Sequence, residues 1–178
     1  LGITELINNQ LFERVHPCLV KKDSYIGNVN GVMNAVIVHG NPIGESILQG
    51  EGAGPGATSS ALMSDLLSIL RGNIKYPFGL PQIKRKVPNI YNINRYSNSL
   101  YLRFEVKDKP GVLSQITKEL AKRSISVARL IQIPDHKRKT DSIVIITHKA
   151  NEDSAQKCIK SIKSNKNILK NPILIRLL

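Results

Sequence analysis

The sequence has few of the features that mark secreted or membrane proteins. Its two cysteines, Cys18 and Cys158, lie far apart in 178 residues, which excludes the disulfide framework of a small secreted domain. No apolar run reaches the roughly 18 residues that a membrane-spanning helix needs. A signal peptide is not expected either, because Glu5, Asn8 and Asn9 interrupt the first ten residues. These absences predict a cytoplasmic protein in a reducing compartment, without membrane contact.

Acidic residues are also scarce, with 13 Asp and Glu against 26 Lys and Arg, for a net charge of +13. Residues 1–98 hold nine basic and six acidic side chains, whereas residues 99–178 hold seventeen and seven. A basic half is typical of nucleic-acid-binding proteins. Solvated lysines in a chain rich in lysine, isoleucine and asparagine give the same charge. Charge alone leaves both explanations open.

Glycine is concentrated in residues 50–70, GEGAGPGATSSALMSDLLSIL. Four glycines and a proline within seven residues exclude a helix or strand interior and predict a tight loop. Apolar residues at helical spacing then predict a helix over residues 57–71 that stops at Gly72. The hydroxyls expected to cap its first turn are those of Thr58, Ser59 and Ser60. Such a start directs unpaired N–H groups at an anion or a polar ligand edge. The alternative is that the glycines only let the helix pack tightly on a strand.

The loop also satisfies the dinucleotide-binding fingerprint G-x-G-x-x-A through Gly52, Gly54 and Ala57. That fingerprint needs a second strand ending in an acid about 20 residues further on. Residues 73–98 follow instead, with three prolines and no strand period. We therefore reject a Rossmann unit and interpret this segment as a linker that crosses a surface. Its charge run, which we expect to be solvated, is Lys84, Arg85 and Lys86.

Two patterns precede the glycine loop. The end of residues 3–20 is predicted to be a strand with Arg14, His16 and Cys18 on one side. His16 and Cys18 could face one metal ion, but no second pair stands at ligand spacing, so we favour a strand edge and assign no metal ligand. Residues 32–40, VMNAVIVHG, form a near-continuous apolar run that predicts a strand buried on both faces.

Residues 100–178 show the clearest pattern. Alternating apolar residues at 100–106 predict a strand, and Asp108 is placed to cap a helix that starts near Pro110 or Gly111. The following elements are strands at 127–133, 142–149 and 172–178, a polar hairpin at 134–141 and a second helix before the last strand. Expected to face inward are Val112, Leu113, Ile116 and Leu120, then Ala155, Cys158, Ile159 and Ile162. This β-α-β-β-α-β order predicts a ferredoxin-like unit after a mixed-sheet first part, an α+β fold.

Two stretches resemble known families. RVHP at 14–17, VNGVMNAVIVHG at 29–40, GES at 44–46 and GEGAGPGATSSALMSDLL at 50–67 are similar, in this succession, to the C-terminal part of the catalytic region of homoserine dehydrogenase. EVKDKPGVLSQITKEL, at the start of the ferredoxin-like unit, resembles an ACT domain, which that family often carries at its C-terminus. The resemblance implies a catalytic and dimerisation segment at residues 1–72, a linker at 73–98 and an ACT regulatory domain at 99–178.

The resemblance implies a parent enzyme that interconverts L-homoserine and L-aspartate 4-semialdehyde with NAD(P), in threonine and methionine biosynthesis. The family's glycine loop lies beside the nicotinamide cofactor. This role carries over to Gly50, Gly52, Ala53, Gly54 and Thr58. Ala57 stands where the family usually has a proline before the threonine; because Thr58 remains, we expect the loop geometry to be retained.

The family's Rossmann domain, acidic substrate ligands and catalytic lysine precede the matched residues. Hydride transfer needs an oriented cofactor and a proton donor or acceptor within about 3 Å. We therefore assign no catalytic residue and hypothesise that the chain alone is not a competent dehydrogenase. Since it begins on Leu1 within a patterned segment, we expect a piece of a longer protein whose partner is a missing N-terminal catalytic half.

The ACT-like segment implies a regulatory amino-acid site, with L-threonine the usual effector in the family. Backbone N–H groups at Gly111, Val112 and Leu113 suit a carboxylate at a helix start, and Asp108 suits an ammonium or hydroxyl group. The alternative is that Asp108 only caps the helix and Pro110-Gly111 only turns the chain. ACT domains usually pair edge to edge, which implies a homo-oligomer with the site at a dimer interface.

Two rival functions stay open from the residues. RNA-recognition domains share the β-α-β-β-α-β order, but the third strand, SIVIITHK, has no aromatic residue on which a base stacks. Nucleic acid is therefore not an expected partner. The other rival is a tail that only dimerises the parent protein and has an inactive effector site.

Overall fold

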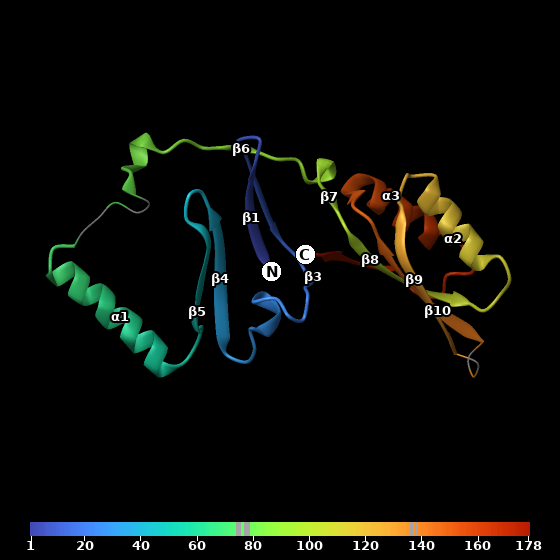
Figure 1. Ribbon diagram of the computed structural model, residues 1–178, viewed down its shortest axis with the longest axis horizontal. Helices are drawn as coiled ribbons and strands as arrows, with labels where there is room; N and C mark the ends of the chain where they lie inside the picture. The colour runs from blue at the N-terminus through green and yellow to red at the C-terminus, as the bar shows by residue number, and fades with distance from the viewer. Residues whose placement is uncertain (74–75, 77–78, 136, 138) are drawn as a thin grey trace. The chain divides into compact units, whose positions relative to one another are not determined.

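The computed structural model describes every residue except 74–75, 77–78, 136 and 138 (Figure 1). Parts of the predicted linker and of the polar hairpin at 134–141 lie outside the described residues. The chain forms two compact units, unit 1 from Leu1–Leu19 and Pro88–Leu178 and unit 2 from Val20–Val87. This division by contacts does not follow the three segments implied by the family resemblance, whose bounds stay a prediction. The fold is α+β, as predicted.

The predicted β-α-β-β-α-β order is confirmed in unit 1. Its elements are β8 (Leu100–Lys107), α2 (Val112–Ala121), β9 (Val127–Asp135), β10 (Thr140–Thr147), α3 (Glu152–Lys163) and β12 (Ile173–Leu177). Together with β3 (Cys18–Leu19) the strands form one sheet in the order β3-β12-β8-β10-β9. All neighbours are antiparallel except β3 and β12, which are parallel. Two short strands, β7 (Ser97–Asn98) and β11 (Ala150–Asn151), pair beside it.

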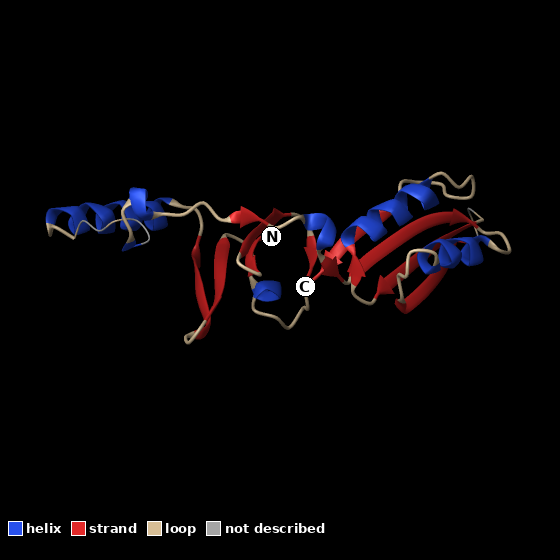
Figure 2. Ribbon diagram, turned by 90° about the horizontal axis from the view of Figure 1, so that it is seen from above, coloured by secondary structure: helices blue, strands red, loops and turns tan. Residues whose placement is uncertain are grey.

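The core of unit 1 lies between this sheet and the helices α2 and α3 (Figures 1 and 2). Burial alternates along β8 and β10, as expected for strands with one face against helices. The buried apolar side chains are Leu100, Leu102, Phe104, Val106, Val112, Ile116, Leu120, Ile125, Ile143, Ile145, Ala150, Ala155, Cys158 and Ile162. The inward faces predicted for both helices are thus confirmed, with Leu113 and Ile159 partly buried against this core.

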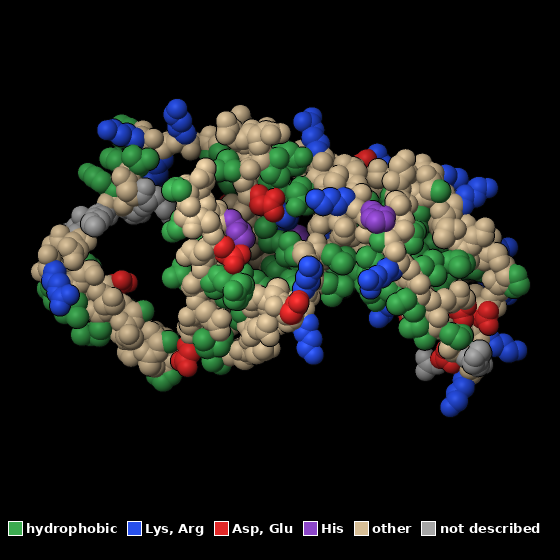
Figure 3. Space-filling model, viewed as in Figure 1, with side chains coloured by type: hydrophobic (Ala, Val, Ile, Leu, Met, Phe, Trp, Pro, Cys, Tyr) green, Lys and Arg blue, Asp and Glu red, His purple; other side chains and the backbone are tan. Residues whose placement is uncertain are grey.

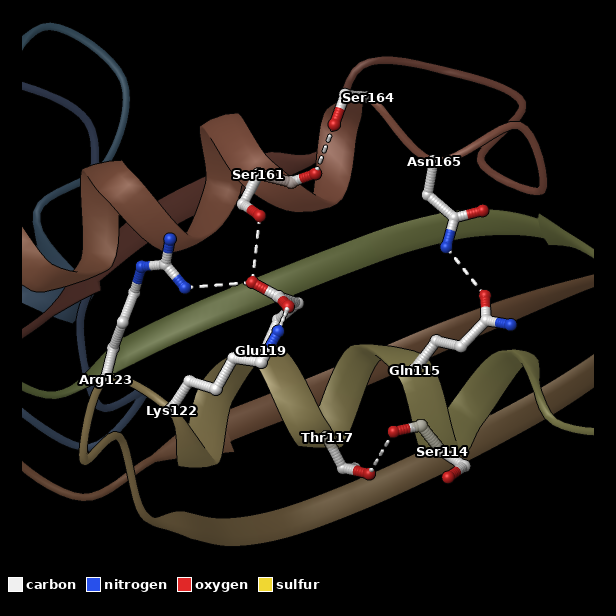
Figure 4. Close-up of polar contacts among 9 residues, drawn as sticks. All are labelled: Ser114, Gln115, Thr117, Glu119, Lys122, Arg123, Ser161, Ser164 and Asn165. Carbon is white, nitrogen blue, oxygen red and sulfur yellow. Dashed lines mark hydrogen bonds and ion pairs between the residues drawn. The ribbon is translucent and has the colours of Figure 1, made fainter.

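Polar contacts join the two helices and hold α2 in place (Figure 4). The Glu119 carboxylate of α2 accepts hydrogen bonds from Lys122 and Arg123, which directly follow α2. It also accepts one from Ser161 Oγ of α3 at 2.8 Å. The Asn165 amide donates to Gln115 Oε1 at 2.7 Å. Hydrogen bonds from Lys122 and then Ser161 lower the pKa of Glu119 to about 2. The network therefore joins the C-terminal end of α2 to α3, and Gln115 in the middle of α2 to the segment after α3.

A second, smaller sheet completes unit 1, with β1 (Gly2–Ile7), β2 (Gln10–Val15) and β6 (Asn89–Ile90). The predicted strand through residues 14, 16 and 18 is wrong: Pro17 has no N–H for a ladder, so β2 stops at Val15 and β3 starts at Cys18. Phe12 of β2 packs against Tyr91 and Tyr96, with ring centroids 5.4 and 4.7 Å apart.

Residues 89–98 therefore carry structure that the missing strand period did not predict. They contain β6, β7 and the 3₁₀ turn η4 (Ile93–Arg95). Their tyrosines cover β2, and the Tyr96 carbonyl accepts a hydrogen bond from Glu152 N at 2.8 Å. Aromatic packing and pairing with distant strands fix this segment, and neither leaves a local periodic signal. Lys84 and its neighbours Arg85 and Lys86 are exposed, as predicted.

Unit 2 contains a hairpin of β4 (Met33–Gly40) and β5 (Gly44–Glu51), the helix α1 (Pro55–Leu70) and the 3₁₀ turns η1 (Ile26–Asn28) and η3 (Gln82–Lys84). The hairpin runs in register from Met33↔Glu51 to Gly40↔Gly44. The prediction that this apolar strand is buried on both faces is wrong: Val36 is 58% exposed. Among the described residues β4 pairs only with β5, so the ribbon has no covering layer within this unit.

Helix α1 begins two residues earlier than predicted, at Pro55. The predicted caps Thr58, Ser59 and Ser60 are wrong, because Pro55 occupies the first helical position and makes Gly54 the N-cap residue. The predicted stop is confirmed: Gly72 has a φ of +72°, and Asn73 N–H donates to Ser68 O at 2.9 Å, a Schellman ending.

The apolar side chains of α1 are exposed to solvent, and Figure 3 shows hydrophobic surface over this helix. Those that recur at helical spacing are Leu62, Met63, Leu66, Leu67 and Leu70, and all are exposed. No helix within the described part of the chain is long and apolar enough to cross a membrane.

Candidate functional site

The glycine loop between β5 and α1 is the first predicted site. Gly52 N–H donates to Val32 O at 2.9 Å, and a Cβ on Gly52 would overlap the Asn34 side chain of β4. At this position glycine leaves room for the Asn34 side chain, and this contact does not involve α1. At Gly50 and Gly54 an added Cβ would meet nothing within 4 Å, and Gly54 has a φ of +120°. At these positions the loop is open.

The start of α1 offers two backbone donors beside this loop. Pro55 has no N–H, and Thr58 N–H already donates to Gly54 O at 3.1 Å. The N–H groups of Gly56 and Ala57 belong to the first turn, whose donors have no partner inside the helix. The predicted cofactor residues are all exposed, with Gly50 at the end of β5, Gly52, Ala53 and Gly54 in the loop, and Thr58 in the first turns of α1.

The second predicted site is the turn from β8 into α2. Here a pocket of about 310 Å³ opens beside the sheet. Its lining consists of residues 106–113 with Gln132, Asp141 and Ile143. Gly111 is the N-cap residue of α2, with a φ of +84°, a left-handed conformation that glycine adopts without strain. An added Cβ there would meet nothing within 4 Å, so the space in front of the helix start is open.

The predicted donors at this helix start are only partly free. Val112 N–H donates to Lys109 O at 3.3 Å. Leu113 N–H lies in the first turn without a partner inside the helix, and Gly111 supplies no side-chain cap. The pocket therefore contains backbone donors that point away from the helix, with the positive end of the helix dipole behind them.

Asp108 does not cap α2, which corrects the prediction. Its side chain is exposed at the pocket rim, and its N–H donates to Lys139 O at 3.1 Å. Lys109 and Pro110 separate Asp108 from the N-cap residue. This spacing takes its carboxylate outside the first turn.

Asp141 is a pocket residue that the sequence reasoning missed. It is only 3% exposed, its Oδ2 accepts a hydrogen bond from Gln132 Nε2, and its Oδ1 has no partner in the described structure. A signal was present: Asp141 alternates with Ile143 and Ile145, so it lies on the core-facing side of a strand. An acid at such a position is unusual without a pairing role.

Other buried charges in unit 1 have structural partners. Burial alone would raise the pKa of Glu152, but hydrogen bonds from Arg176 and Gln156 outweigh it and leave the pKa below its usual value. Arg14 donates to Glu5 Oε1 at 2.7 Å and lies over the Phe12 ring.

The two candidate metal ligands do lie together, with Cys18 Sγ 3.1 Å from His16 Nδ1. A metal site needs more ligands than this pair supplies. Among the described residues no group of three or more His, Cys, Asp or Glu side chains could hold a metal ion.

Comparison with known proteins agrees with the fold. Residues 100–167 match the ACT domain model, and residues 3–67 match the homoserine dehydrogenase model. Homoserine dehydrogenases of Neisseria gonorrhoeae and Helicobacter pylori are each 33% identical over 99% of this chain. The solved homoserine dehydrogenase of Thiobacillus denitrificans is 30% identical, covers 99% of the chain and superposes with a TM-score of 0.85.

The β-α-β-β-α-β fold and the match of residues 100–167 define a protein with an ACT domain. More particularly, the chain corresponds to the C-terminal region of the homoserine dehydrogenase family, whose model matches ahead of the ACT domain. The chain spans 42% of the length of the two curated relatives and 41% of the Thiobacillus chain.

Proposed function

We propose that this chain is the regulatory C-terminal part of an NAD(P)-dependent homoserine dehydrogenase of threonine and methionine biosynthesis in the cytoplasm. Its ACT domain binds an amino acid, L-threonine, as a feedback effector. The observation that carries the proposal is the pocket at the start of α2, which combines open backbone donors with carboxylates.

The effector's carboxylate accepts hydrogen bonds from the backbone N–H groups of Gly111 and Leu113, whereas Val112 N–H already donates to Lys109 O. The helix dipole favours a negative charge at this end. Asp108 lies at the rim, where it interacts with a polar group of the ligand. At about 310 Å³ the pocket is at the small end of the range for ligand sites, which favours an amino acid over a nucleotide.

A second copy of the chain pairs along β9 in this proposal. β9 is an edge strand of the five-stranded sheet, and all nine of its residues are exposed. Its apolar side chains include Leu130, Ile131 and Ile133. Unpaired edges of this kind add strands from another chain. Because Gln132 of the same strand lines the pocket, pairing there puts the effector site at a dimer interface.

The glycine loop with Gly50, Gly52, Ala53, Gly54 and Thr58 lines the nicotinamide side of the cofactor in the complete enzyme. The missing N-terminal half supplies the nucleotide-binding domain and the catalytic lysine and packs against the apolar face of α1. The lengths of the relatives support this assignment, since they are more than twice as long as the chain.

The effector proposal is tested by calorimetric titration of the purified chain with L-threonine, with the other L-amino acids and NADP as controls. Saturable threonine binding between the micromolar and millimolar range, about −8 to −4 kcal/mol, is expected. Gly111→Asp, which adds a negative charge where the carboxylate binds, abolishes it in a folded protein. Gly111→Asn is the neutral control of the same size and retains most of the affinity. Unchanged binding by Gly111→Asp contradicts the assigned site.

The enzyme proposal is tested by NADPH-dependent reduction of L-aspartate 4-semialdehyde. The purified chain alone is expected to show no turnover. Addition of a separately expressed N-terminal half from a relative is expected to restore activity that L-threonine inhibits. Robust turnover by the chain alone would contradict the proposal that it depends on a missing half.

A further inference from the structure

We propose that the Asp141 carboxylate at the floor of the α2 pocket binds the ammonium group of the amino acid whose carboxylate lies on the helix start. This inference rests on the proposed amino-acid-binding function and assigns the cationic subsite to Asp141 rather than to Asp108.

Asp141 has the environment of a binding group. Asp141 is only 3% exposed. Its Oδ2 accepts a hydrogen bond from Gln132 Nε2, whereas its Oδ1 has no hydrogen-bond partner among the described residues. A buried carboxylate oxygen without a donor is costly, and buried charges are normally paired. An incoming N–H donor removes this cost.

The neighbouring strands explain why the described residues supply no donor to Asp141 Oδ1. In the sheet Asp141 lies between Val106 of β8 and Pro134 of β9. The Val106 side chain is apolar, and Pro134 has no N–H group. The lysines of the lining, Lys107 and Lys109, are exposed and form no ion pair with Asp141 in the described structure. Gln132 fixes the carboxylate orientation and leaves Oδ1 for a ligand.

The pocket thus contains two subsites of opposite preference. The start of α2 favours a negative group, and Asp141 favours a positive one. A zwitterionic α-amino acid satisfies both, whereas a phosphate or a carboxylic acid without an amino group meets repulsion from Asp141. Asp108 is exposed at the rim, where water screens its charge and its contribution is small.

The test compares two ligands on the full chain by calorimetry: L-threonine and 3-hydroxybutanoate, which is threonine without its amino group. The variants are Asp141→Asn, which is of equal size, Asp108→Asn at the rim, and Asp153→Asn, a charge-matched control on α3 outside the pocket lining. Circular dichroism checks that each variant is folded.

The wild-type chain is expected to prefer threonine by about tenfold or more, as for a charged hydrogen bond. Asp141→Asn loses about tenfold in threonine affinity and most of the preference between the two ligands. Asp108→Asn and Asp153→Asn change the threonine affinity and the preference between the two ligands by less than about threefold. Should Asp141→Asn not fold, the wild-type preference decides alone, and equal affinities overturn the inference.

The inference and the proposed function fail differently. If the wild-type chain binds threonine but Asp141→Asn retains the preference for the amino group, only the Asp141 subsite is wrong. If Asp108→Asn alone loses the preference, the rim carboxylate is the ammonium ligand instead. If the wild-type chain binds neither threonine nor any other L-amino acid, the proposed effector function fails as well.

Discussion

Helices α1 and α2 carry similar apolar patterns but have opposite surroundings. In α2 the apolar positions Val112, Ile116 and Leu120 are buried against the sheet. In α1 the corresponding face, which includes Leu66 and Leu67, is exposed, and none of the described residues of unit 2 is buried. Hydrophobic periodicity indicates that a helix has an apolar face, but not whether the covering surface lies in the same chain.

The largest expected contrast is between matched leucines of the two units. Leu102→Ala, at a side chain 1% exposed, should lower the free energy of unfolding of unit 1 by about 3–5 kcal/mol. Leu67→Ala in unit 2, at a side chain 41% exposed, should change the free energy of unfolding of unit 2 by less than about 0.5 kcal/mol. Urea denaturation followed by circular dichroism measures both. Equal losses of unfolding free energy in the two variants would contradict the expected difference between a buried and an exposed leucine.

The next contrast concerns charge pairs at one helix of unit 1. Arg176 Nε donates to Glu152 Oε2 at 3.0 Å, and Glu152 is buried. Glu152→Ala should cost about 2–3 kcal/mol, below the value for a fully buried pair because Arg176 keeps some exposure. Its neighbour Asp153 pairs with Lys157 near the surface, so Asp153→Asn should cost about 0–1 kcal/mol. Thermal unfolding of both variants distinguishes them, and similar midpoints would contradict the account.

Unit 1 should also lose stability in acid. The pKa of Glu119 is lowered from 4.5 to about 2 in the folded protein, chiefly by hydrogen bonds from Lys122 and Ser161. A carboxyl group whose pKa is lowered by folding stabilises the protein above its unfolded pKa, and this contribution disappears as pH falls through the folded pKa. Glu119→Gln should therefore weaken the pH dependence of thermal unfolding between pH 4.5 and pH 2. Glu13→Gln, on the exposed side of β2, is the control; an equal effect would exclude the α2–α3 network as the cause.

The smallest expected effects are local to α1. Gly72→Ala puts a Cβ at a φ of +72° and should destabilise the helix end by about 1–2 kcal/mol. Gly56→Ala, inside the helix with open space around it, should stabilise the helix by up to about 1 kcal/mol. Amide exchange of α1 reports both changes. Opposite signs are expected, and a shared sign would contradict the observed ending.

The fold of the ACT domain could be predicted because each of its elements has a local signal. Alternation at β8, the apolar stripe of α2 and the turn at Pro110-Gly111 need no knowledge of distant contacts. The cover of Tyr91 and Tyr96 over Phe12 could not be predicted, since it joins residues about 80 positions apart.

The lining of the α2 pocket could be predicted only in part, because only some of its residues have a local signal. The turn with Gly111 is local, whereas the partner of Asp141 depends on the β9–β10 register that brings Gln132 beside it. The capping role expected of Asp108 was wrong because α2 begins at Val112, and sequence spacing does not fix a helix start to within one or two residues.

Hydrogen–deuterium exchange of the full chain, with and without saturating L-threonine, tests the central claim most directly. The account predicts slow exchange in β8, β10, α2 and α3, fast exchange in α1 and β4, and added protection from threonine at residues 106–113, Gln132 and Asp141. Slow exchange of α1 in the isolated chain, or threonine protection at residues 50–58 in place of the α2 pocket, would contradict it.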